Sequence, residues 1–271
     1  MGESFSIVKH AHLAFIVDLS DKRGEYIYSS LENLGYKVFA MDENFDLEVI
    51  QNFKFVYLYA PRVKLSLEHT EQILPNSIVF CLGMRSEIKE KLANNGIAVK
   101  KYFDDELFAL NNAYLTALGT RMILEDNLIK PISNCSALVL GGGRVGRSVC
   151  KMLEKYKTSV TVATKDTIEF ALLQGMCGRV VQFKNFDADL SDYDVIINTV
   201  PAVVLKQKHL KKCNKNCFIL DLASMPGGVD FVIAKKLGLQ VEHALGVPGR
   251  FLPIEASQIM LSSVLKRINN G

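Results

Sequence analysis

The chain reads Ala137-Leu138-Val139-Leu140-Gly141-Gly142-Gly143-Arg144-Val145-Gly146-Arg147-Ser148 near its centre, and this stretch decides the fold of the second half of the chain. Its apolar beginning is long enough for one buried strand, and the residues after it have the spacing of a helix. Between them lie glycines in the pattern G-x-G-x-x-G. The stretch therefore predicts the strand, turn and helix of a dinucleotide-binding site.

Each glycine of this pattern has a separate role. Gly141 permits the tight turn after the strand, Gly143 lets the backbone approach a pyrophosphate, and Gly146 lets the helix pack closely. The helix start at Arg144 and Val145 offers unpaired N–H groups and a positive dipole end to phosphates. A second strand, predicted at 159–164, follows at the expected distance, which favours a dinucleotide site over a tight turn without a ligand.

The end of this second strand bears on the choice between NADP and NAD. NAD sites usually have an acidic residue there, which binds the ribose 2′-OH. Here the strand ends in Thr164 and Lys165, whose hydroxyl and cation suit a 2′-phosphate. The sequence therefore favours NADP. NAD stays the alternative, because a small loop shift could bring Asp166 to the ribose, and Lys165 could equally be a solvated loop residue.

Length and composition suit a folded protein of two domains. The 271 residues are 49% hydrophobic and 23% charged, and the net charge is only +3. The one basic cluster, at 206–215, lacks interleaved aromatic residues, so we expect no nucleic-acid partner. No signal sequence or membrane-length apolar run is visible. Six scattered cysteines without zinc-ligand spacing predict free thiols, no metal site and a cytoplasmic location.

Strands alternate with helices before and after a long helical stretch at 105–128. This alternation predicts an α/β fold of two doubly wound parallel sheets. We expect a flavodoxin-like substrate domain at 1–110, a linking helix at 111–130 and a Rossmann NAD(P)-binding domain at 131–253. Residues 245–253 read as a loop. A C-terminal helix at 254–271 should pack back on the first domain.

In such a sheet, ligands bind beyond the carboxyl ends of the strands. Residues 199–201 should lie beside the ribose next to the nicotinamide, and residues 221–224 beside the nicotinamide itself. The candidates for cofactor contact outside the glycine turn are Thr164, Lys165, Thr199, Val200, Pro201, Leu222, Ala223 and Val247.

The catalytic candidates come from both domains. Arg62 and Arg85 follow strands of the first domain, and their paired N–H donors could hold a substrate carboxylate, although either could be an ordinary surface arginine. Ser224 and Glu255 are the polar candidates nearest to the expected site. No histidine has an obvious partner, so the general base stays open.

Four segments together resemble a known family, the A subunits of dipicolinate synthases. They are 140–146, 196–201, 219–231 and 246–249, and the run from Asp221 to Phe231 is the most specific. The resemblance covers nearly all of the second domain. It implies an NADP-linked dehydrogenase of sporulating bacteria that oxidises dihydrodipicolinate, a small dicarboxylate, to dipicolinate and works with a flavoprotein B subunit.

The chain departs from the family pattern mainly on the substrate side. The family usually has a glutamate where Leu118 stands, an arginine where Met225 stands, and different residues at 17–23 and 254–257. Two other functions therefore stay open. They are a nucleotide-binding subunit without catalysis and a dehydrogenase of another small carboxylic acid, and the sequence does not decide between a monomer and a homo-oligomer.

Overall fold

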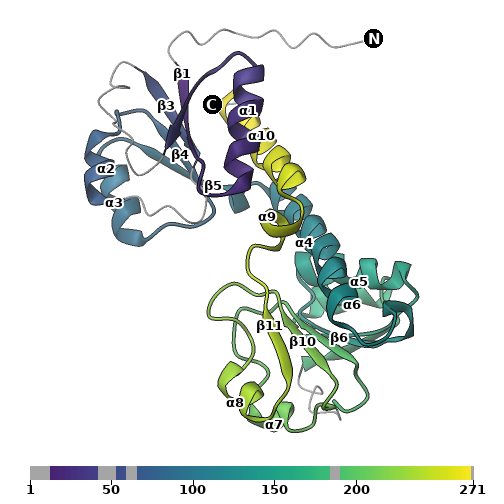
Figure 1. Cartoon of the computed structure of the whole chain (residues 1–271). Coiled ribbons are helices and arrows are strands. Elements are labelled where there is room, and N and C mark those ends of the chain that lie inside the picture. The colour runs from purple at the N-terminus through teal and green to yellow at the C-terminus, as the bar shows by residue number, and fades with distance from the viewer. Residues whose placement is uncertain (1–12, 42–52, 59–65, 184–189, 270–271) are drawn as a thin grey trace, which may run out of the picture. The chain divides into compact units, whose positions relative to one another are not determined.

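The computed structural model describes residues 13–41, 53–58, 66–183 and 190–269. It divides into two compact units, each built around one sheet (Figure 1). Unit 1 comprises Met1–Ala109 and Pro253–Gly271, and unit 2 comprises Leu110–Leu252. The chain therefore leaves unit 1 once and returns to it for its last helix.

Unit 1 has a five-stranded sheet in the order β2-β1-β3-β4-β5, and all its pairings are parallel. This is the strand order of flavodoxin-like sheets. The strands are β1 (Leu13–Asp18), β2 (Lys37–Met41), β3 (Lys54–Leu58), β4 (Ile78–Cys81) and β5 (Ala98–Lys101). The helices are α1 (Lys22–Asn33), α2 (Leu67–Gln72), α3 (Ser86–Asn94), α10 (Pro253–Asn269) and the start of α4 (Glu106–Asn127).

Both faces of this sheet are covered, because successive side chains of a strand point to opposite faces. Ala14 and Ile16 of β1 join a buried cluster with residues of α3. Phe15 and Val17 join another cluster with α1 and with Met260 of α10. The C-terminal helix thus packs against α1 in unit 1, as predicted.

Unit 2 has a six-stranded parallel sheet in the order β11-β10-β9-β6-β7-β8. Counted within the unit, this is the 3-2-1-4-5-6 order of Rossmann folds, with the switch point between β6 and β9. The strands are β6 (Ser136–Leu140), β7 (Ser159–Thr164), β8 (Arg179–Gln182), β9 (Val195–Asn198), β10 (Phe218–Asp221) and β11 (Gln240–His243). The helices are α5 (Arg144–Lys155), α6 (Thr167–Gln174), α7 (Gln207–Leu210), α8 (Phe231–Lys236), α9 (Val247–Phe251) and most of α4.

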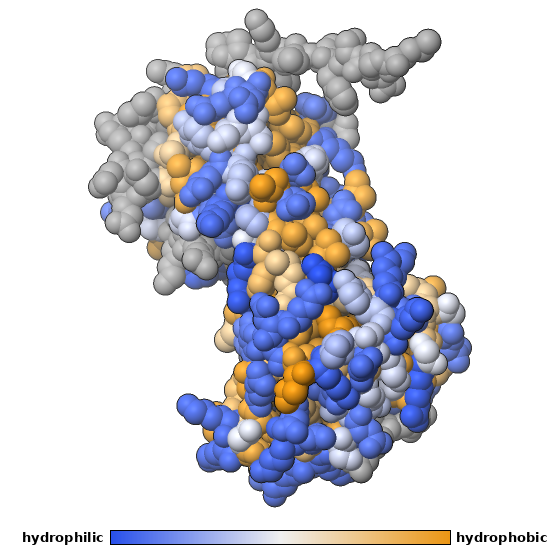
Figure 2. Space-filling model, turned by 45° about the vertical axis from the view of Figure 1, so that its right-hand side comes forward, coloured by the Kyte–Doolittle hydropathy of each residue, from blue (hydrophilic) through white to orange (hydrophobic). Residues whose placement is uncertain are grey.

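The apolar residues of unit 2 lie between the sheet and its helices. One buried cluster joins the sheet to α4, α5 and α6, and another joins it to α7 and α8. Hydrophilic residues cover most of the face of this unit that Figure 2 shows, with hydrophobic residues in smaller groups between them. Among the described helices, none combines the length and the apolar character that a membrane span requires.

The predicted loop at 245–253 is wrong in part, because it contains the short helix α9. Gly246 precedes this helix with a φ of 64°, and Pro248 lies in its first turn, where a helix tolerates proline. Val247 is buried, and a Cβ atom added to Gly119 of α4 would overlap its side chain. The packing of α9 on α4 therefore stabilises a segment whose glycines and prolines are typical of a loop.

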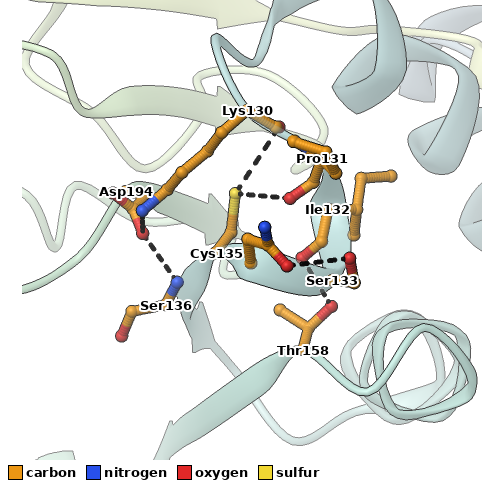
Figure 3. A network of polar contacts seen from close by, with 9 residues as sticks. Lys130, Pro131, Ile132, Ser133, Cys135, Ser136, Thr158 and Asp194 are labelled. Atoms are coloured by element: carbon orange, nitrogen blue, oxygen red, sulfur yellow. Dashed lines mark hydrogen bonds and ion pairs between the residues drawn. The ribbon is translucent and has the colours of Figure 1, made fainter.

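A polar network fastens the amino-terminal edge of this sheet (Figure 3). Asp194 accepts a hydrogen bond of 2.7 Å from the backbone N–H of Ser136 and pairs with Lys130 at 2.9 Å. The hydroxyl of Thr158 donates to the carbonyl of Ile132 at 3.0 Å. These contacts fix where β6 begins, at the edge opposite to the glycine turn.

Candidate functional site

The glycine turn follows β6 at the carboxyl edge of the six-stranded sheet. Gly141 has a φ of 101°, which favours glycine, and an added Cβ atom would overlap the Thr199 hydroxyl. A Cβ atom on Gly146 would overlap the carbonyl oxygen of Gly141, so α5 packs against the turn without a side chain between them. The fold itself therefore requires glycine at both positions.

Gly143 differs from these two glycines, because the fold does not require it. A Cβ atom added there would have Glu169 Oε1, at 3.7 Å, as its only neighbour within 4 Å. Gly143 is the N-cap of α5, and no side chain caps the first turn of that helix. The open backbone and the uncapped N–H groups fit the diphosphate of a dinucleotide.

The segment after β9 is fixed beside this turn. Thr199 donates two hydrogen bonds to the carbonyl of Leu140, each of 2.9 Å, from its backbone N–H and its hydroxyl. Asn198 is fully buried; its amide donates to Val200 O at 3.0 Å and accepts from Val200 N–H at 3.1 Å. Thr199 and Val200 are therefore held next to the end of β6, where they were predicted to meet the cofactor.

Asp221, at the end of β10, organises the next loop. Its buried carboxylate accepts from Asn198 Nδ2 at 2.7 Å, from Ala223 N at 3.1 Å and from Gly228 N at 2.6 Å. Three donors compensate the cost of burying this charge. The loop that carries Leu222, Ala223 and Ser224 thus winds around one carboxylate.

His243 supports the same loop from β11. Its Nε2 lies 2.8 Å from the carbonyl of Ala223, and its ring stacks on Phe231 with centroids 5.2 Å apart. Because a carbonyl only accepts, this contact requires the proton on Nε2. The sequence showed His243 near a strand end but gave no partner for it, since the partner depends on the neighbouring strand.

The end of β7 differs from the prediction. The hydroxyl of Thr164 is buried and donates to Glu169 Oε2 at 2.6 Å, so it is not directed at a cofactor phosphate. Asp166, the alternative ribose ligand, caps α6 through hydrogen bonds to the N–H groups of Ile168 and Glu169. Lys165 is exposed. Glu169 was missed, although an acidic residue three positions after an Asp N-cap is typical of a first helical turn.

The remaining cofactor candidates have different surroundings. Arg144 and Pro201 are exposed, whereas Val145 and Leu222 are half-buried against the core. The Val247 side chain is 2% exposed, so it packs in the core and is not available for a cofactor contact.

The four catalytic candidates are not brought together by any contact in the described residues. Ser224 is exposed in unit 2. Arg85, the N-cap of α3, and Glu255, in the first turn of α10, are exposed in unit 1. Arg62 lies outside the described residues. Their roles stay predictions.

The thiols offer no alternative chemistry. All six cysteines are described and free, and burial raises the pKa of Cys213 to about 11. A thiol with a raised pKa stays protonated at neutral pH and is a weak nucleophile. Within the ranges that the structure covers, no three His, Cys, Asp or Glu residues are grouped to hold a metal ion.

Comparison with known proteins agrees with this geometry. The family model for shikimate and quinate 5-dehydrogenases matches residues 124–241. The A subunit of dipicolinate synthase of Bacillus subtilis (strain 168) is 28% identical over 206 residues, which is 76% of this chain and 69% of that protein.

Two solved structures show the same fold. The A subunit of dipicolinate synthase from Bacillus halodurans has a TM-score of 0.82 at 23% identity, with 95% of this chain and 97% of the other covered. A transhydrogenase from Sinorhizobium meliloti has a TM-score of 0.70 at 13% identity, covering 95% and 93%. These similarities support a dehydrogenase-type enzyme and confirm the predicted fold of two parallel α/β sheets. They also confirm the predicted resemblance of this chain to the A subunit of dipicolinate synthase.

Proposed function

We propose that this chain is a nicotinamide-dinucleotide-dependent oxidoreductase that oxidises dihydrodipicolinate to dipicolinate during sporulation. The observation that carries the proposal is the open backbone at Gly143, between two glycines that the fold requires. The resemblance to the A subunit of dipicolinate synthase supplies the substrate. A bound NADP or NAD would accept the hydride that the ring of the substrate loses.

The residues of unit 2 would bind and orient the dinucleotide. The N–H groups of residues 143–146 would hold the diphosphate. Thr199, Val200 and Pro201 would border the ribose next to the nicotinamide, and Ala223 with Ser224 would border the nicotinamide. The contacts of Asp221 with both loops keep these segments in place before the cofactor arrives, which lowers the ordering cost of binding.

Substrate binding needs cations, because dihydrodipicolinate carries two carboxylates. Arg85 and Arg62 of unit 1 are the residues that we expect to pair with them. Ser224 and Glu255 are the candidates for moving the ring proton. Because the relative is one of the two different subunits of a synthase, we also expect a cytoplasmic location and, as partner, a flavoprotein B subunit.

The substitution Gly143→Ala tests the dinucleotide site. It should leave stability within about 0.5 kcal/mol of the wild type, because the added methyl group has space. The methyl group would meet the diphosphate, so affinity for NAD and NADP should fall at least tenfold, about 1.4 kcal/mol. Isothermal titration calorimetry measures the affinity, and urea unfolding measures the stability.

Gly175→Ala is the matched control, because Gly175 ends α6 with a negative φ and a Cβ atom there meets nothing within 4 Å. It should change neither quantity. Unchanged dinucleotide affinity in Gly143→Ala would contradict the proposed site.

The reaction is tested with enzymatically generated dihydrodipicolinate, either dinucleotide and the flavoprotein partner. Appearance of dipicolinate absorbance supports the substrate assignment. Binding without turnover would instead favour a nucleotide-binding subunit. The match to shikimate and quinate dehydrogenases favours a third function, so shikimate and small hydroxy acids should be assayed in parallel.

A further inference from the structure

The carboxylate of Glu169 lies directly at the glycine turn. A Cβ atom on Gly142 would be 2.8 Å from its Oε2, and one on Gly143 would be 3.7 Å from its Oε1. Glu169 belongs to the first turn of α6, which follows β7, whereas the glycines follow β6. The carboxylate therefore lies between the carboxyl ends of two neighbouring strands.

The position of this carboxylate is fixed from two sides. Its Oε2 accepts the hydrogen bond of 2.6 Å from the buried hydroxyl of Thr164. The backbone N–H of Glu169 donates to Asp166 Oδ1 at 2.9 Å, which anchors the start of the helix. Oε1 is the oxygen on the side of Gly143. A preorganised acceptor thus borders the proposed dinucleotide site at its β7 end.

In Rossmann folds this end of the second strand meets the ribose of the adenosine, where an acidic residue binds the 2′-OH. We infer that Glu169 accepts a hydrogen bond from that hydroxyl and makes the chain select NAD over NADP. The inference rests on the proposed function. It opposes the NADP preference predicted from Thr164 and Lys165, because the Thr164 hydroxyl is bonded to Glu169 and an exposed lysine alone must offset the carboxylate.

The repulsion between a carboxylate and a 2′-phosphate gives the size of the effect. Like charges brought together in a binding site cost several kcal/mol, while a hydrogen bond to a charged acceptor contributes about 1.5 to 3 kcal/mol. NAD would gain the hydrogen bond, and NADP would meet the repulsion.

The test is calorimetric titration of the full chain with NAD and with NADP, which does not depend on turnover. The wild type should bind NAD at least tenfold more tightly. Glu169→Gln should raise NADP affinity at least tenfold and lower NAD affinity several-fold, so that the preference disappears or inverts. Glu169→Asp keeps the charge but shortens the side chain, so it should weaken NAD without a gain in NADP.

Glu154→Gln is the control with the same change of charge. Glu154 of α5 lines a groove with Ser136 and Ser159, the first residues of β6 and β7, at the opposite edge of the sheet. It should leave the ratio of the two affinities unchanged. Rising salt should reduce the wild-type preference, because screening weakens repulsion.

The outcomes separate this inference from the proposed function. Tighter binding of NADP than NAD by the wild type, or an unchanged ratio in Glu169→Gln, overturns the role of Glu169 and leaves a dinucleotide-dependent enzyme intact. A wild type that binds neither dinucleotide at millimolar concentration overturns both.

Discussion

The two sheets of this chain begin with the same structural device. In each unit the helix after the first strand of that unit carries a glycine that leaves room for a backbone carbonyl. A Cβ atom on Gly24 would overlap Asp18 O in unit 1, and one on Gly146 would overlap Gly141 O in unit 2. Close packing of strand and helix is therefore common to both units.

The turns differ in what they present at the carboxyl edge. In unit 2 the turn consists of three glycines and exposes backbone N–H groups. In unit 1, Asp18 accepts from Ser20 N at 2.8 Å, and Asp21 caps α1 and pairs with Arg23 at 2.8 Å. Two carboxylates at this turn would repel a diphosphate. The strand order provides the edge of the sheet, and the residues of the turn decide whether it can bind a dinucleotide.

The largest expected effect comes from adding one methyl group at the shared device. Gly24→Ala and Gly146→Ala each force a Cβ atom into backbone, which cannot move aside as a side chain can. Each should cost about 3 kcal/mol or more in the free energy of unfolding, at the upper end for overpacking. Urea unfolding measures the loss, and only Gly146→Ala should also abolish dinucleotide binding by the molecules that remain folded.

Gly83→Ala and Gly175→Ala are the matched controls for units 1 and 2, because a Cβ atom at either position meets nothing within 4 Å. Both should lie within about 0.5 kcal/mol of the wild type. If Gly24→Ala abolished dinucleotide binding while unit 1 stayed folded, the assignment of the site to the unit 2 turn would be wrong.

The second effect concerns the buried carboxylate of unit 2. Asp221→Asn replaces an acceptor by an amide that cannot accept from Asn198, Ala223 and Gly228 at once. The loss should be about 2 to 3 kcal/mol, since unpaired buried donors bear their full desolvation cost. Thermal and urea unfolding measure it, and dinucleotide affinity should fall because both cofactor loops lose their anchor.

Asp192→Asn in the same unit serves as the comparison, because Asp192 is exposed. It should change stability by less than about 0.5 kcal/mol. An equal loss in both variants would mean that Asp221 does not organise the loops.

The parts of the site that could be predicted are those that depend on local sequence. The glycine spacing predicted the turn, and alternating strands and helices predicted both sheets, because each signal lies within about 30 residues. The pairing of Asp221 with Asn198 could not be predicted so directly, since it depends on β9 and β10 being neighbours in register. Glu169 was missed for a similar reason: its side chain reaches back from α6 to the turn after β6.

The last comparison concerns how the units are closed, because unit 1 depends on a helix from the far end of the chain. Ser263 of α10 is buried, and its hydroxyl donates to Asp105 Oδ2 at 2.8 Å. Burial alone would raise the pKa of Asp105, but this hydrogen bond and the backbone N–H groups of Phe108 and Leu107 lower it below its ordinary value of 3.8.

Ser263→Ala should therefore destabilise unit 1 by about 1 kcal/mol at pH 7, the usual net value of one hydrogen bond. Because the folded-state pKa of Asp105 lies below its unfolded value, this contribution is present above pH 3.8 and is lost as the pH falls through the folded-state pKa. Urea unfolding at pH 7, 5 and 3 should give a constant difference at the two higher values and a smaller one at the lowest. Ser257→Ala is the control, because that buried hydroxyl donates to Ile254 O within the same helix and has no titrating partner. A difference for Ser263→Ala that stays the same at pH 3 would show that packing, and not the bond to Asp105, holds α10 on unit 1.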